Sequence, residues 1–241
     1  MTAAFTGDTD AALHAAERAF AAAEARSDEK MALSALFIES GALAGLGVFD
    51  RAADVADDAL RRAKLYGHPT MITAAVITAA GLYSGSLPAE PDFARCLELL
   101  TREGVGLSRN DIGGMWLDLM GASARLGLDR PGAIESYVRV AHTADRLNAH
   151  HVLDIAVRGL AIIAAEAGLA DSAHALVAYT ETNLGAYRMA AWTWMEARLD
   201  RALATLPQRG HEPALHRSDI LQLITEIEIS LAGEKPIIGD T

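Results

Sequence analysis

The chain contains one cysteine among 241 residues, so no disulfide can form within it and no cage of cysteines can hold a metal ion. Its longest apolar run, residues 71–80, includes two threonines and is far shorter than the roughly 20 residues that span a bilayer. The first nine residues contain no basic residue and no apolar run, unlike a secretory signal. These absences predict a cytoplasmic protein without a membrane partner.

Basic residues are also few, with 21 Lys and Arg against 32 Asp and Glu and a formal net charge of −11 at pH 7. A surface that binds a phosphate backbone needs clustered basic side chains. Arg61 and Arg62 are the only adjacent basic pair in the chain. The composition therefore argues against nucleic acid as a direct partner.

What the chain does contain is apolar residues, at 51 % of the total, with alanine prominent among them. Alanine combines the highest helix propensity with a small side chain that lets helices approach closely. Aromatic residues make up only 5 %, and no segment alternates apolar and polar residues as a half-buried strand would. The sequence therefore predicts an all-α fold.

A glycine followed by a short polar turn and an alanine-rich helix recurs along the chain. The turns begin at Gly7, Gly47, Gly85, Gly127 and Gly168, which gives a period of about 40 residues. We expect each glycine to end the preceding helix in the left-handed conformation, and the aspartate in the turn to cap the next helix. The pattern predicts an α-solenoid of antiparallel helical hairpins.

This pattern places one helix before each glycine and one after it. The helices after the glycines are predicted at 9–26, 50–66, 90–103, 130–146 and 171–184, and those before them at 28–46, 69–84, 109–126, 149–167 and 188–205. A last helix is predicted at 216–231, after Pro213. We expect a single repeat domain over residues 1–232 and a flexible tail over 233–241.

The arrangement resembles tetratricopeptide repeats, with a unit about one helical turn longer than the 34 residues of that family. Segments 129–133, 156–161, 168–175 and 197–203 are similar to the C-terminal helical arm of MalT-like LuxR-type regulators, related signalling ATPases and certain adenylate cyclases. The resemblance implies a regulatory module of a bacterial signalling or transcription system. The chain contains neither a G-x-x-x-x-G-K-[ST] phosphate loop nor a basic helix-turn-helix at its C-terminus.

In tetratricopeptide folds the first helix of each hairpin lines the concave groove, so polar stripes on those helices are candidates for binding a partner. Three stripes have helical spacing, and their members are Asp111, Asp118 and Arg125, then His151, Asp154 and Arg158, then Arg188, Trp192 and Glu196. The alternative is a solvated face. A metal site at His151 and Asp154 is disfavoured because the guanidinium of Arg158 lies on the same stripe.

We expect a module that binds a protein or peptide, without a cofactor or metal. No G-x-S-x-G nucleophile motif occurs, and Cys96 lies among leucines, where a thiol is normally buried and inert, so an enzyme is not predicted. The alternative is a sensor that binds a small inducer. A closed apolar pocket would favour the inducer, and an open polar groove would favour a peptide.

The predicted helix around residues 71–83 carries no charge on any face. A helix that is apolar all round has to be covered all round. The first helix likewise has no preceding helix to cover its outer side. We therefore expect one of these surfaces to meet another chain, most simply a second copy in a homodimer; the alternative is a superhelix that curls tightly enough to bury them.

Overall fold

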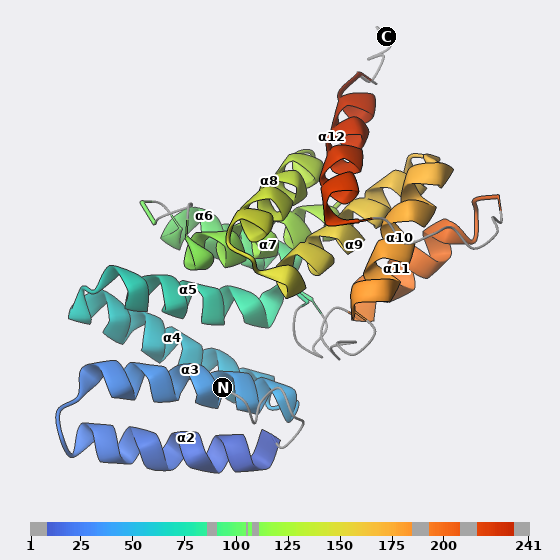
Figure 1. Cartoon of the computed structure of the whole chain (residues 1–241). Coiled ribbons are helices and arrows are strands. Elements are labelled where there is room, and N and C mark those ends of the chain that lie inside the picture. The colour runs from blue at the N-terminus through green and yellow to red at the C-terminus, as the bar shows by residue number, and fades with distance from the viewer. Residues whose placement is uncertain are drawn as a thin grey trace, which may run out of the picture. The chain divides into compact units, whose positions relative to one another are not determined.

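A computed structural model describes residues 9–85, 91–104, 106–107, 111–184, 193–207 and 216–233. Within these ranges the chain forms eleven helices and no strand, so it is all-α (Figure 1). The helices are α2 (Thr9–Glu24), α3 (Glu29–Gly45), α4 (Phe49–Tyr66), α5 (Pro69–Tyr83), α6 (Phe93–Glu103), α7 (Ile112–Gly127), α8 (Ala133–Arg146), α9 (His150–Glu166), α10 (Ala170–Leu184), α11 (Thr193–Leu203) and α12 (Arg217–Gly233). A helix lies at each of the eleven predicted positions; the predicted starts at residues 90, 109 and 188 lie outside the described residues, and the other bounds agree to within three residues.

The chain divides into two compact units. The first contains residues 1–129 with 190–192, and the second contains 130–189 with 193–241. Helices α2 to α7 therefore belong to the first unit, and α8 to α12 belong to the second. A single domain over 1–232 stays a prediction, and residues 234–241 of the predicted tail lie outside the described residues.

The glycine turns at Gly47 and Gly168 have the predicted conformation. Each glycine lies two residues beyond the end of a helix, with φ of 78° and 76°. The N–H of Val48 donates to the carbonyl oxygen of Leu43 at 2.9 Å, and the residue after Gly168 makes the corresponding bond at 2.9 Å. This is the Schellman pattern, in which a left-handed residue lets the chain turn back and satisfy the last helical carbonyls.

The prediction for Gly127 is wrong. Gly127 is the last residue of α7, and Asp129 takes the left-handed conformation instead, with φ of 50°. A Cβ atom on Gly127 would lie 2.1 Å from the ring of Phe93. Glycine is required at this position by close packing against α6, not by the turn. Gly85 has the expected left-handed φ, at 76°, and Gly7 lies outside the described residues.

In the first unit, α3, α5 and α7 lie side by side, and α2, α4 and α6 pack against their neighbours in sequence. Ala52, Ala75 and Ala80 are among the fully buried residues of the core. The uncharged helix α5 contacts α3, α4, α6 and α7, all within this unit. Its neighbours within the chain therefore cover much of its apolar surface, although Ile72 and Ile77 stay partly exposed.

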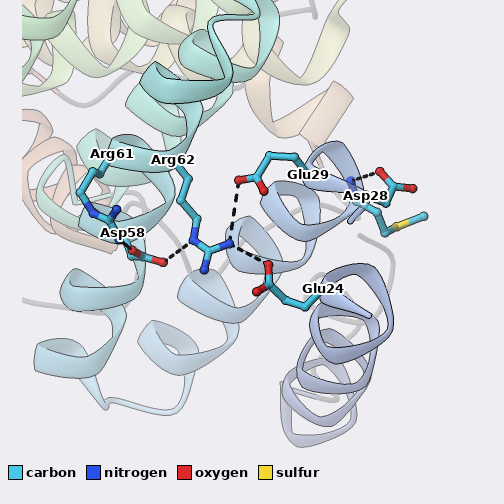
Figure 2. A network of polar contacts seen from close by, with 7 residues as sticks. Glu24, Asp28, Glu29, Asp58, Arg61 and Arg62 are labelled. Atoms are coloured by element: carbon cyan, nitrogen blue, oxygen red, sulfur yellow. Dashed lines mark hydrogen bonds and ion pairs between the residues drawn. The ribbon is translucent and has the colours of Figure 1, made fainter. Parts of the chain in front are cut away.

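A polar network ties α4 to the first two helices (Figure 2). Arg62 Nη1 lies 2.9 Å from Glu24 Oε1 on α2 and 3.9 Å from Glu29 Oε1 on α3, and Arg62 Nε lies 2.9 Å from Asp58 Oδ2. The guanidinium carbon also lies 5.2 Å from the ring centroid of Phe20. The guanidinium of Arg62 therefore interacts with acidic side chains from three helices. Its flat face also covers the apolar ring of Phe20.

In the second unit, α9 packs against α8, α10, α11 and α12. The fully buried ring of Tyr137 on α8 lies against Gly159 of α9, where a Cβ atom would approach the ring to 2.4 Å. The last helix, α12, packs against α8, α9 and α10 (Figure 1). The final helix therefore turns back over earlier helices of its own unit.

Candidate functional site

The first unit contains an open groove of about 600 Å³ between α4 and α6, with the end of α5 at one side. Its lining residues are Asp57, Tyr83, Asp92, Ala94, Arg95, Glu98, Leu99 and Arg102. Five of these eight carry a charge, and both signs are present. The groove is therefore polar and suited to a solvated, charged segment.

Local sequence explains why α6 presents its charges here. The carboxylate of Asp92 accepts a hydrogen bond from the backbone N–H of Arg95 at 3.0 Å and caps the helix. Arg95, Glu98 and Arg102 then follow at spacings of three and four, which place them on one face. The opposite face buries apolar side chains, including Cys96. The amphipathic pattern of α6 therefore points its charges into the groove.

The aromatic wall of the groove is Tyr83. The guanidinium carbon of Arg95 lies 4.4 Å from the centroid of its ring, which is a cation–π contact. Burial raises the pKa of the Tyr83 phenol, the charge of Arg95 lowers it, and Asp57 and Asp92 raise it further. The hydroxyl is therefore neutral at physiological pH and can donate or accept a hydrogen bond.

The two walls of the groove are joined near the C-terminal ends of α4 and α6. Lys64 Nζ lies 2.5 Å from Glu103 Oε2, and Arg102 Nε lies 2.9 Å from Glu103 Oε1. The hydrogen bond from Lys64 lowers the pKa of the Glu103 carboxyl, burial opposes this, and Arg102 lowers it again. Within the described residues, Asp57 and Arg95 have no ion pair; Arg95 stacks on Tyr83, and both charged side chains line the groove.

The first predicted stripe does not line this groove. The carboxylate of Asp111 caps α7 by accepting a hydrogen bond from the N–H of Gly114 at 2.8 Å. Asp118 is only 8 % exposed, and Arg125 is half-buried beside Gly121. The capping bond gives Asp111 a structural role, and a recognition role for this stripe stays a prediction.

The structure brings together two residues from the other stripes. Arg158 on α9 and Glu196 on α11 form an ion pair. Asp154 is 5 % exposed, and burial raises its pKa to about 6, although His150 and Arg158 lower it. His151 lies at the exposed start of α9, and burial followed by the charge of His150 lowers its pKa.

The remaining candidates, Arg188 and Trp192, lie outside the described residues. The groove between α4 and α6 was missed by the sequence analysis. Its one signal was the spacing of Asp92, Arg95, Glu98 and Arg102, and charges at helical spacing are also typical of any solvated face. A charged face becomes the wall of a groove only through the placement of the neighbouring helix.

Three further observations concern the thiol, metal ligands and membrane-spanning helices of the described residues. Cys96 is fully buried, which confirms the predicted burial, and burial followed by the charge of Asp92 raises its thiol pKa to about 12; its inertness stays a prediction. No group of three His, Cys, Asp or Glu within the described residues could hold a metal ion. None of the described helices is both long and apolar enough to cross a membrane.

Comparison of the chain with protein-family models, with characterised proteins and with solved structures finds no match. The class that the fold defines is an all-α protein in which helices that are neighbours in sequence pack against each other. A proposal for its function therefore has to rest on the geometry of its own residues.

Proposed function

We propose that this protein is a tetratricopeptide-like α-solenoid that binds a protein or peptide, and that a charged segment of the partner lies in the groove between α4 and α6. The observation that carries the proposal is the groove itself, which is open and lined mainly by charged side chains. Enclosed apolar pockets are typical of small-molecule sites. An open, charged groove suits a peptide better than a small inducer.

Regular loop spacing supports the solenoid. Left-handed residues occur at 27, 47, 67, 85, 106, 129, 148 and 168, between 18 and 23 residues apart, with a further one at Gly132. Two such intervals equal the 40-residue period of the glycine turns. The side-by-side packing of α3, α5 and α7 also suits a solenoid, in which equivalent helices of successive hairpins stack.

The charges in the groove indicate the chemistry of the partner. Asp57 can attract a basic side chain, and Arg95 can attract an acidic one or stay stacked on Tyr83. A peptide with both charges would meet complementary groups at both walls. We further propose that such binding serves a regulatory role in a bacterial cytoplasm, a role supported by the resemblance of segments 129–133 and 168–175 to the arms of signalling regulators.

A peptide-display selection on the purified chain tests the proposal. Selected peptides are then measured against Asp57→Arg and against Asp54→Arg, which reverses an exposed charge on α4 that does not line the groove. We expect Asp57→Arg to weaken binding by about tenfold, equivalent to roughly 1.4 kcal/mol, and Asp54→Arg to leave it unchanged. Equal loss in both variants would show that the charge of α4, and not the groove, attracts the peptides.

A further inference from the structure

The last described helix of the second unit buries one apolar stripe against other helices of the same unit. α12 lies across α8, α9 and α10 (Figure 1). The side chains of Ile220, Ile224 and Ile227 are 0 %, 0 % and 1 % exposed. Their spacing of four and then three residues is that of the anchors of an amphipathic helix bound in a groove.

The other side of α12 is solvent-exposed and mainly polar. Ser218, Gln222, Thr225 and Glu226 are exposed, and Gln222 donates a hydrogen bond to Glu226 at 2.9 Å along the helix surface. Near the C-terminal end, Ile229 is 67 % exposed. The helix therefore has one apolar stripe that fits the surface of α8, α9 and α10, and a separate solvated face.

A polar clamp fixes the N-terminal end of α12. Arg217 Nε lies 2.5 Å from Asp145 Oδ1, and Nη2 donates to the Asp145 carbonyl oxygen at 2.6 Å. Arg217 Nη1 lies 3.3 Å from His150 Nδ1, which has to accept because a guanidinium only donates. The clamp therefore recognises the C-terminal end of α8, where the helix dipole attracts a cation and the Asp145 carbonyl oxygen accepts from Arg217 in addition to the N–H of Asn148.

We propose that α8, α9 and α10 form a helix-binding groove, that α12 is its occupant in cis, and that a partner helix of the same chemistry competes for it. That partner carries aliphatic side chains at positions i, i+4 and i+7 and an arginine three residues before the first of them. The groove is separate from the one between α4 and α6, so this inference does not depend on the peptide site of the first unit.

A labelled peptide of residues 216–233, added to the full-length chain, tests the inference. The wild-type chain binds it weakly, because a helix tethered in cis acts at a high effective concentration. Ile224→Ala in the chain weakens the cis helix and leaves the groove unchanged, so we expect the peptide to bind at least about tenfold more tightly. In the peptide, Arg217→Ala lowers the affinity for this opened chain by about tenfold, and Gln222→Ala on the solvated face does not change it.

If Ile224→Ala disturbs folding, as judged by its circular dichroism melt, Arg217→Ala in the chain opens the groove by removing only the clamp side chain, which is 30 % exposed. Failure of either folded variant to bind the peptide at millimolar concentration overturns the inference. Equal affinity of the wild-type, Arg217→Ala and Ile224→Glu peptides also overturns it. Such a result would show that neither the arginine nor the buried isoleucine of the peptide contributes to binding.

Discussion

The two units differ in whether the surface between two of their helices is open or covered by a third helix. In the first unit, the groove between α4 and α6 is open and lined by Asp57, Arg95 and other charged side chains. In the second unit, α12 covers α8 and α10 and buries Ile220 and Ile224 there. A surface between two helices can therefore stay solvated, as between α4 and α6, or be covered by a third helix, as between α8 and α10, and the side chains on that surface favour one outcome or the other.

The units also differ in where they place charge. Arg62 of the first unit interacts with three acids that are all partly or largely exposed. The second unit buries the carboxylate of Asp154 almost completely. A buried charge loses its hydration, so burial of the Asp154 carboxylate lowers the stability of the second unit. The charges around Arg62 in the first unit keep contact with water and do not have this cost.

The largest expected effect is that of an alanine substitution at Gly159 in the second unit, compared with the same substitution at Gly41 in the first. Gly159→Ala places a methyl group 2.4 Å from the ring of Tyr137, so we expect the variant to lose about 3 kcal/mol of unfolding free energy. Gly41→Ala in α3 meets no atom within 4 Å and is expected to gain about 0.5–1 kcal/mol from its higher helix propensity. Urea denaturation followed by circular dichroism measures both. Similar changes in the two variants would contradict the close packing of α8 on α9.

The next largest expected effect concerns the buried carboxylate of Asp154 in the second unit. Burial raises the pKa of Asp154 from 3.8 to about 6 in the folded chain, so the folded state takes up a proton. Because the folded-state pKa of Asp154 is above its unfolded value, protonation of this carboxyl favours the folded chain. This contribution to stability is fully present below the unfolded pKa of 3.8, and it is lost as the pH rises through the folded pKa of about 6. We expect Asp154→Asn to be about 2 kcal/mol more stable than the wild type at about pH 7, and the difference to shrink towards about pH 4.

Denaturation at several pH values measures this difference. Asp57→Asn, at an exposed carboxylate of the first unit's groove, serves as the control and is expected to leave stability unchanged. A benefit from Asp154→Asn that is the same at every pH would argue against a titrating buried carboxylate.

The smallest effect concerns the network of Figure 2. We expect Arg62→Ala to lose about 1 kcal/mol, because the guanidinium is partly buried, balances three acids and covers Phe20. Arg61→Ala removes a 65 % exposed side chain that pairs with Asp58 alone and is expected to change stability by only a few tenths of a kcal/mol. Thermal melts of the two neighbouring variants compare them. A loss in Arg61→Ala as large as that in Arg62→Ala would argue against the network.

Most of the helix bounds were predictable because local chemistry sets them. Pro69 begins α5, Asp111 caps α7, and Gly47 and Gly168 follow the ends of α3 and α9. Each of these signals acts within about one helical turn. The exception, Gly127, follows the same local pattern, but its glycine is required by Phe93, from a helix more than 20 residues earlier in the chain.

The candidate site was much less predictable. Spacing placed His151, Asp154 and Arg158 on one stripe, yet His151 is exposed, Asp154 is buried, and Arg158 pairs with Glu196. Periodicity shows which side chains share a face of one helix, and it carries no information on which neighbour covers that face. The groove of the first unit depends on the distance between α4 and α6, which no single segment specifies.

The sequence by itself determined the all-α class, the approximate positions of the helices and the left-handed turns at Gly47, Gly85 and Gly168, because propensity and capping act between residues a few positions apart. Only the tertiary structure decided that α4 and α6 leave a charged groove open, that Asp154 loses its water, and that α12 turns back over α8 and α10. The physical reason is that burial is non-directional: an isoleucine stripe such as that of α12 is stabilised by any apolar surface it can cover. The choice among such surfaces depends on shape and on clamps such as Arg217 and Asp145, which form only when distant segments meet.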